Sequence, residues 1–213
     1  MITDRQADIL DEIIREYVKL AQPVSSHLLE KKKCLDVSSA TIRNEMQKLT
    51  EDGYLCQPHT SAGRVPTDKG YRFFVDSLLK RRRNPVEIRM ESPIQEIIRF
   101  LSEETSALAL GYSADDEIFW KQGWQDIFEE PEFNEPGLAA AFARMIDDLE
   151  ENINDIMTPE IQVYIGKENP FSKIQDFSII ASGFDGGVFA ILGPKRMSYD
   201  RNINLMQKIW KKK

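Results

Sequence analysis

The sequence from Ser38 to Arg72 reads SSATIRNEMQKLTEDGYLCQPHTSAGRVPTDKGYR and decides the fold of the first part of the chain. Its pattern predicts an amphipathic helix, a short β-hairpin with a basic, glycine-containing tip, and the start of another helix. That order is typical of a winged helix-turn-helix, which places one helix in a DNA major groove and a loop on the adjacent backbone. We therefore interpret the earlier residues as scaffold and the later ones as a control or assembly domain.

The helix that begins near Ser38 or Ser39 has one apolar and one polar side. On a wheel of about 100° per residue, Ile42, Met46 and Leu49 fall together. The remaining surface carries small, hydroxyl, amide and basic residues: Ala40, Thr41, Arg43, Asn44, Gln47 and Lys48. Amides pair with adenine, Arg with guanine and Lys with phosphate. We predict that the first five read bases and that Lys48 contacts the backbone; in an isolated helix, a solvated face would have the same composition.

The hairpin tip, residues 58–66, combines hydroxyls, a histidine and an arginine around a glycine. Short hydroxyl side chains and backbone N–H groups can lie close to a phosphodiester, the glycine permits the turn, and the arginine can reach phosphate or the minor groove. The predicted wing contacts are His59, Thr60, Ser61, Gly63 and Arg64. We expect no metal at His59, because only His27 and two distant cysteines could join it.

Helices are predicted on both sides of this stretch. Residues 3–21 carry an apolar stripe at helical spacing, with Thr3 as N-cap and Pro23 ending the pattern. A second, shorter helix opens at Ser25 or Ser26, and residues 67–83 form a helix with a basic end. Hydroxyls at a helix N-terminus can hold a DNA phosphate, although capping alone explains them equally well. We add four residues to the predicted backbone contacts: Ser25, Ser26, Ser39 and Arg72.

Composition indicates a globular protein whose charge is unevenly distributed. The 213 residues, 41% of them hydrophobic and 30% charged, suffice for one large or two modest domains. Residues 1–83 carry 15 Lys and Arg against 12 Asp and Glu, whereas residues 84–213 carry 13 against 23. The basic half is therefore the N-terminal one. No apolar run approaches the roughly 20 residues of a membrane span and no signal peptide is evident, so we expect a cytoplasmic protein without membrane contact.

Four segments within the first eighty residues resemble one bacterial family, the HrcA heat-inducible transcription repressors. They are residues 23–26 (PVSS), 39–46 (SATIRNEM), 49–55 (LTEDGYL) and 57–72 (QPHTSAGRVPTDKGYR). The resemblance implies a winged helix-turn-helix domain, residues 1–83, that binds an inverted-repeat operator of the CIRCE type ahead of chaperone genes. It also implies a homodimer, since two modules roughly 34 Å apart read a palindromic site, and dependence on a GroE-type chaperonin.

The sequence pattern of the second half predicts a separate domain built around a β-sheet. Asn84-Pro85 and Ser92-Pro93 mark a linker, residues 84–93, and the domain then covers residues 94–213. A helical stripe runs from Ile94 to Leu108, strand-like residues follow, a polar turn is expected at residues 123–126, and an acidic helix occupies residues 138–149. Three β-like runs, residues 161–165, 177–181 and 187–192, precede a final helix. This order predicts an α+β fold class.

Three pieces of this half, residues 130–133, 165–169 and 192–199, are similar to the GAF-like domain of HrcA. The resemblance implies a GAF-like regulatory or dimerisation domain. Family members are typically longer and carry a dimerisation segment inserted in that domain, for which this sequence has little room. We therefore expect a GAF-like domain of reduced size, and the resemblance leaves the dimer interface unassigned.

Patterns that support catalysis are missing from the sequence of the second half. It contains no histidine, no phosphate-binding loop and no dinucleotide-binding glycine pattern. We expect no enzyme, no cofactor and no metal. The leading hypothesis is a sequence-specific DNA-binding repressor of heat-shock genes. The alternative is a sensor or interaction protein whose acidic C-terminal domain binds a chaperone or a small ligand, with weakened DNA binding.

Overall fold

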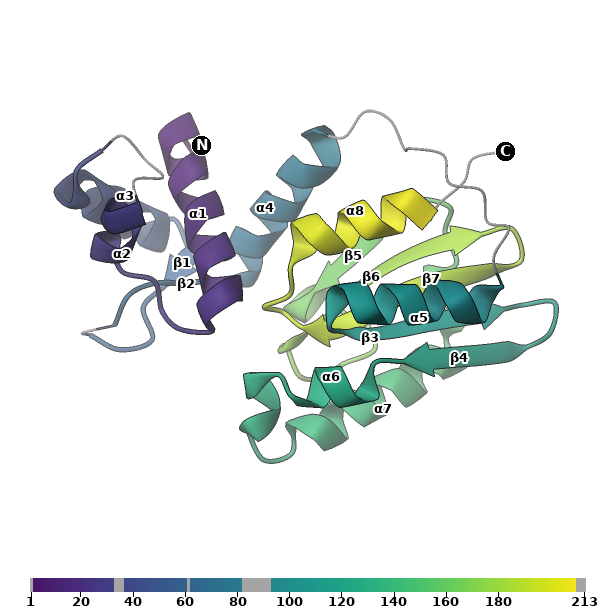
Figure 1. Ribbon diagram of the computed structural model, residues 1–213. Helices are drawn as coiled ribbons and strands as arrows, with labels where there is room; N and C mark the ends of the chain where they lie inside the picture. The colour runs from purple at the N-terminus through teal and green to yellow at the C-terminus, as the bar shows by residue number, and fades with distance from the viewer. Residues whose placement is uncertain (1, 33–36, 61, 82–92, 210–213) are drawn as a thin grey trace. The chain divides into compact units, whose positions relative to one another are not determined.

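The computed structural model describes residues 2–32, 37–60, 62–81 and 93–209 (Figure 1). Their contacts divide the chain into two compact units, Met1–Arg81 and Arg82–Lys213. The predicted linker, residues 84–93, lies outside the described residues except for Pro93.

The first unit contains four helices and a two-stranded hairpin among its described residues. In chain order they are α1 (Asp4–Leu20), α2 (Ser26–Lys32), α3 (Ser39–Glu51), β1 (Leu55–Cys56), β2 (Val65–Pro66) and α4 (Asp68–Arg81). The two strands pair in antiparallel fashion, with Leu55 opposite Pro66 and Cys56 opposite Val65. The hairpin thus follows directly after α3 and leads directly into α4.

Local sequence explains the start and the buried side of α1. The Thr3 side chain accepts a hydrogen bond from the Gln6 backbone N–H, and the Gln6 side chain accepts one from the Thr3 N–H, which forms a capping box. The predicted cap at Thr3 is therefore confirmed. The apolar stripe is buried, with Ile9 and Ile13 fully shielded from solvent. Such amphipathic burial supplies most of a helix's stability in a folded protein.

The second unit is built around a sheet flanked by helices. Its main elements are α5 (Ile94–Thr105), β3 (Leu108–Ser113), β4 (Ile118–Gln122), α6 (Trp124–Phe128), α7 (Leu138–Glu151), β5 (Gln162–Ile165), β6 (Phe177–Phe184), β7 (Gly187–Pro194) and α8 (Tyr199–Ile209). Three short 3-10 helices, Pro131–Asn134, Ile153–Ile156 and Gly166–Glu168, lie between them. Mixed helix and antiparallel sheet make this an α+β protein, as predicted.

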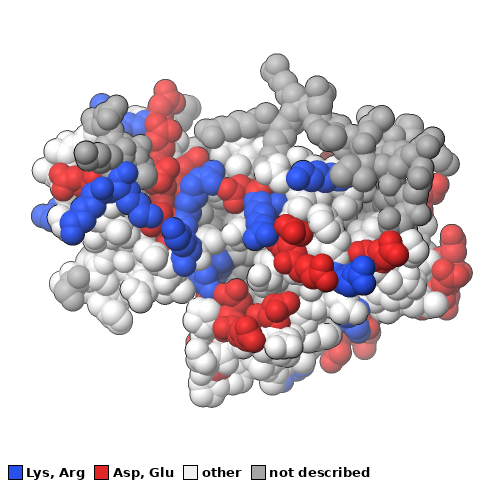
Figure 2. Space-filling view, in the orientation of Figure 1, with Lys and Arg blue, Asp and Glu red and all other residues white. Residues whose placement is uncertain are grey.

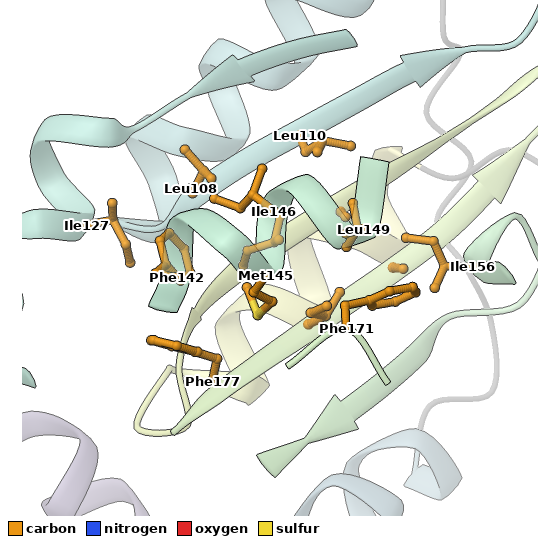
Figure 3. Close-up of a cluster of buried hydrophobic side chains, with 14 of the residues drawn as sticks. Leu108, Leu110, Ile127, Phe142, Met145, Ile146, Leu149, Ile156, Phe171 and Phe177 are labelled. Carbon is orange, nitrogen blue, oxygen red and sulfur yellow. The ribbon is translucent and has the colours of Figure 1, made fainter. Parts of the chain in front are cut away.

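The five strands form one antiparallel sheet in the order β4-β3-β7-β6-β5. Helices α5 and α8 cover one face, and α7 covers the other (Figure 1). The main core lies between α7 and the sheet, where Phe142 packs against Phe177 with ring centroids 5.0 Å apart (Figure 3). On the other face, β3 approaches α5 closely, because a Cβ on Gly111 would lie 2.9 Å from Ile98 Cδ1.

Two local predictions for this unit are wrong. Leu108 is not part of the first helix of the domain, because α5 ends at Thr105 and Ser106 adopts a left-handed conformation, φ 50°, that turns the chain into β3. Residues 123–126 do not form a simple turn: Gly123, at φ 100°, precedes the short helix α6. In both cases a single left-handed residue changes the chain direction, and apolar spacing does not reveal it.

Candidate nucleic-acid interface

Helix α3 separates a buried side from an exposed side. Ile42, Met46 and Leu49 are buried, as the helical wheel predicts. Five predicted contact residues on the helix are exposed, namely Ala40, Arg43, Asn44, Gln47 and Lys48, and Thr41 is half-buried. The helix therefore presents a continuous surface of one small, two amide and two basic side chains, which is a composition suited to a major groove.

The N-terminus of α3 is fixed by hydroxyl groups. Ser38 is the N-cap: its Oγ accepts from the Thr41 backbone N–H at 3.3 Å and lies 3.1 Å from Thr41 Oγ1. The Ser39 backbone N–H donates to Glu30 Oε1 at 2.9 Å, and Ser39 Oγ donates to Ser26 Oγ at 3.4 Å. These bonds join the start of α3 to α2.

The two serines at the start of α2 have different environments. Ser25 is exposed, and its Oγ accepts from the Leu28 backbone N–H at 3.2 Å, so it acts as a cap. Ser26 is 7% exposed, and its hydroxyl faces Ser39. Of the pair, Ser25 is the one whose position leaves it open to a phosphate.

Arg64 connects the hairpin to α3. Its Nε donates to Thr50 Oγ1 at 2.9 Å, and its Nη2 donates to Gln47 Oε1 at 3.2 Å. Gln47 in turn donates from Nε2 to Glu51 Oε1 at 3.0 Å. A predicted wing residue and a predicted base-reading residue are thus hydrogen-bonded to each other, although 17 positions separate them in sequence.

Backbone hydrogen bonds hold the base of the hairpin against the segment before α2. The Val24 N–H donates to the Arg64 carbonyl at 2.9 Å, and the Arg64 N–H donates to the Val24 carbonyl at 2.8 Å. A Cβ on Gly63 would lie 2.3 Å from the Val24 carbonyl oxygen. Gly63 does not have a positive φ, so the prediction that it permits the turn gives the wrong reason for a glycine at this position. Glycine is needed here because two backbones approach each other closely.

The tip of the hairpin is exposed at His59 and Thr60, and Ser61 lies outside the described residues. Gln57, which our sequence reasoning did not single out, donates from Nε2 to the carbonyls of Thr60 and Ala62, both at 2.9 Å. These two bonds close the tip. In the sequence, this role is indicated only by the spacing: the Gln57 amide precedes the two carbonyls that it binds by three and five residues.

Arg72 lies near the start of α4, shortly after the hairpin in sequence. Its Nη1 donates to Asp76 Oδ1 at 3.3 Å, one turn further along the same helix, and the side chain is half-buried. One partner of Arg72 is therefore on its own helix, whereas Gln47 of α3 and Arg64 of the hairpin contact each other.

Surface charge differs between the units. On the face shown in Figure 2, basic side chains form a band over the first unit, and acidic side chains predominate over the second. Asp147, Asp148 and Glu151 are exposed on α7. This distribution favours the first unit as the surface for a polyanion.

The second unit contains a surface cavity of about 340 Å³ between α7 and the segment before β6. The buried residues of its lining are apolar and the exposed ones are charged; the lining residues are Ala141, Arg144, Met145, Asp147, Asp148, Phe171, Ser172, Lys173 and Ile174. Elsewhere in this unit, burial would lower the pKa of Arg196, but hydrogen bonds and charge from Glu132 and Glu130 outweigh burial and raise it. These ion pairs join the loop after β7 to the 3-10 helix before α7.

Within the described part of the chain, no three His, Cys, Asp or Glu side chains gather in a way that could hold a metal ion. No described helix has the length and apolar character needed to span a membrane.

Comparison with known proteins identifies relatives over the whole chain. A heat-inducible transcription repressor HrcA from Lachnoclostridium phytofermentans is 25% identical over an alignment of 330 positions that covers 98% of this chain and 95% of that protein. Because the alignment is longer than this 213-residue chain, an internal part of the relative has no counterpart here. The HrcA repressor of Acetivibrio thermocellus is 45% identical over 114 residues, 51% of this chain and 32% of that protein.

Structural comparison supports the same fold throughout. The crystal structure of a hypothetical protein superimposes with a TM-score of 0.79 at 21% identity and covers 99% of this chain and 97% of the other. The family described as "HrcA protein C terminal domain" matches residues 72–203, which is more than half of the sequence. The chain therefore belongs to the HrcA family of heat-inducible transcription repressors.

Proposed function

We propose that this protein represses heat-shock chaperone genes by binding an inverted-repeat operator of the CIRCE type as a dimer. In this proposal the first unit is a winged helix-turn-helix: α2 and α3 are the helix pair, α3 enters the major groove, and the hairpin is the wing. The second unit is a GAF-like domain that controls or assembles the first. The protein acts in the cytoplasm, where it reaches chromosomal DNA.

One observation carries the proposal: the exposed side of α3. Ala40, Asn44 and Gln47 lie opposite the buried Ile42 and Leu49, so the face that is free of the core is the face with base-reading chemistry. Asn44 and Gln47 match adenine edges, and Arg43 matches guanine. His59 and Thr60, exposed at the hairpin tip, are proposed phosphate contacts with Lys48 and Ser25.

Binding to DNA of defined sequence tests the proposal directly. Affinity for a CIRCE duplex and for a scrambled duplex of equal length is measured over a salt series with the full chain. We expect the operator to bind at least about a thousandfold more tightly at physiological salt, with log affinity falling linearly against log salt. Equal affinity for the two duplexes would contradict the proposal.

Dimerisation needs its own measurement, because an internal part of the longer relatives has no counterpart here. Two symmetry-related modules are required to read the two halves of an inverted repeat. Light scattering after size exclusion, with and without the operator, is expected to show in the complex a protein mass of twice the 24.6 kDa chain, in addition to the mass of one duplex. A single protein chain on each duplex would contradict dimeric binding.

The cavity of the second unit favours a secondary function, the binding of a small ligand, and the family resemblance adds a GroE-type chaperonin as the other candidate partner of this domain. The buried apolar residues of the cavity and its exposed residues of both charge signs fit a small polar organic molecule. A thermal-shift screen of metabolites and a pull-down with purified chaperonin distinguish the two partners. Retention of operator affinity in the presence of a bound partner would show that this second function does not regulate the first.

A further inference from the structure

We propose that Arg64 determines DNA specificity as a positioning residue, by fixing the side-chain amide of Gln47, rather than by neutralising a phosphate. The inference rests on the proposed DNA-binding function. It follows from two hydrogen bonds of the Arg64 guanidinium, to Thr50 on the partly buried side of α3 and to Gln47 on its exposed side.

The chemistry of the neighbours allows only one orientation of the amide. Arg64 is a donor only, so it must face the amide oxygen, and the Glu51 carboxylate is an acceptor only, so it must face the amide nitrogen. Turning the amide over would place its NH₂ group against the guanidinium and its oxygen against the carboxylate. The amide of Gln47 is therefore oriented before DNA arrives.

The fixed amide keeps the groups needed to read a base. A carbonyl oxygen has two lone pairs and an NH₂ group has two hydrogens, so one acceptor and one donor remain on Gln47 after its bonds to Arg64 and Glu51. One acceptor beside one donor is the pattern that glutamine presents to the adenine N6 and N7 edge. Fixing this pattern in advance lowers the entropic cost of binding the correct base.

Arg64 is itself held in place through both its backbone and its side chain. Its backbone N–H and carbonyl both bond to Val24, and Thr50 Oγ1, its other side-chain partner, donates to the Met46 carbonyl at 2.7 Å. The Arg64 backbone is thus anchored to the segment before α2, and its guanidinium is anchored to α3.

Replacing Arg64 by lysine separates the two roles, because lysine keeps the charge but cannot make the two-point contact. For Arg64→Lys we expect the affinity ratio of operator to scrambled duplex to fall roughly tenfold while the salt slope stays unchanged. Adding Gln47→Ala to this variant should reduce the ratio little further. The matched control is Arg5→Lys, an exposed arginine on α1, which should leave the ratio unchanged.

The opposite results would overturn the inference. A phosphate contact predicts that Arg64→Lys preserves the ratio and that Arg64→Gln weakens both duplexes equally, with a salt slope smaller by about one. Full additivity of Arg64→Lys and Gln47→Ala would also overturn it, because coupled residues give non-additive effects.

A measurement without DNA distinguishes failure of this inference from failure of the proposed function. Nitrogen-15 relaxation of the Gln47 side-chain amide in the full chain should show a rigid group that becomes mobile in Arg64→Lys. A mobile Gln47 amide in the unmodified protein would overturn the positioning role even if the operator binds. A rigid amide in a protein that binds both duplexes equally would instead refute the operator function.

Discussion

Helices α3 and α7 are both amphipathic, but their exposed sides carry net charges of opposite sign. Each buries one apolar side, through Ile42, Met46 and Leu49 in α3 and through Phe142, Met145 and Leu149 in α7. The exposed side of α3 carries amides with Arg43 and Lys48, whereas that of α7 carries alanines and the acidic residues Asp147, Asp148 and Glu151. Burial therefore explains why both helices form, and only their exposed residues distinguish them chemically.

The largest expected effects come from the buried sides. Phe142 is fully buried and contacts the rings of Phe128, Phe133 and Phe177. Replacing it by alanine should destabilise the second unit by about 3–5 kcal/mol, and Ile42→Ala should destabilise the first by about 2–5 kcal/mol. Denaturant unfolding followed by hydrogen exchange resolves the two units. Loss of protection in both units from either variant would contradict their description as separate compact units.

A smaller effect is expected where the first unit needs glycine. A Cβ at Gly63 would press on the Val24 backbone, so Gly63→Ala should cost about 1–3 kcal/mol through forced backbone shifts. Gly193→Ala in β7 is the matched comparison, because its Cβ would meet the flexible end of Ile127 at 3.2 Å and should cost less. Thermal unfolding of both variants measures the difference. Equal losses of stability in the two variants would mean that the backbones of Gly63 and Val24 are not in close contact.

The exposed side of α3 should control specificity. Asn44→Ala is expected to reduce discrimination between operator and scrambled duplex by about 1–3 kcal/mol, because one bidentate base contact is lost. The change should alter stability little, since Asn44 is exposed. Fluorescence anisotropy titrations with both duplexes provide the measurement. The control is Asn154→Ala, at an exposed residue of the second unit. If it reduced discrimination between the two duplexes equally, α3 would not be the surface that reads the bases.

The smallest effect concerns one basic residue on each of the two helices. Lys48→Ala should weaken binding to every duplex a few-fold and reduce the salt slope by about one, because one phosphate contact releases its counterions. Arg144→Ala removes one basic residue from the exposed side of α7 and should leave the slope unchanged. Titrations at several salt concentrations compare the two variants. A reduced slope for Arg144→Ala would mean that the second unit also contacts DNA.

Local sequence was sufficient for the elements themselves and for the exposed side of α3. Apolar spacing and capping residues predict α1, α3 and α7, because these signals act within one or two helical turns. The β-like runs similarly locate β5, β6 and β7. Leu108 shows where this reasoning fails: its spacing continues the stripe of α5, but the left-handed Ser106 ends the helix before it.

The sequence by itself determined the class of the protein and the two amphipathic faces, and it predicted the residues that contact DNA. Only the tertiary structure decided which of these residues contact one another. Gln47 meets Arg64, and Gly63 meets Val24, across gaps in sequence that no helical or strand period spans. Such contacts depend on how α2, α3 and the hairpin pack in three dimensions. That packing turned a predicted wing cation into a partner of a predicted base-reading amide.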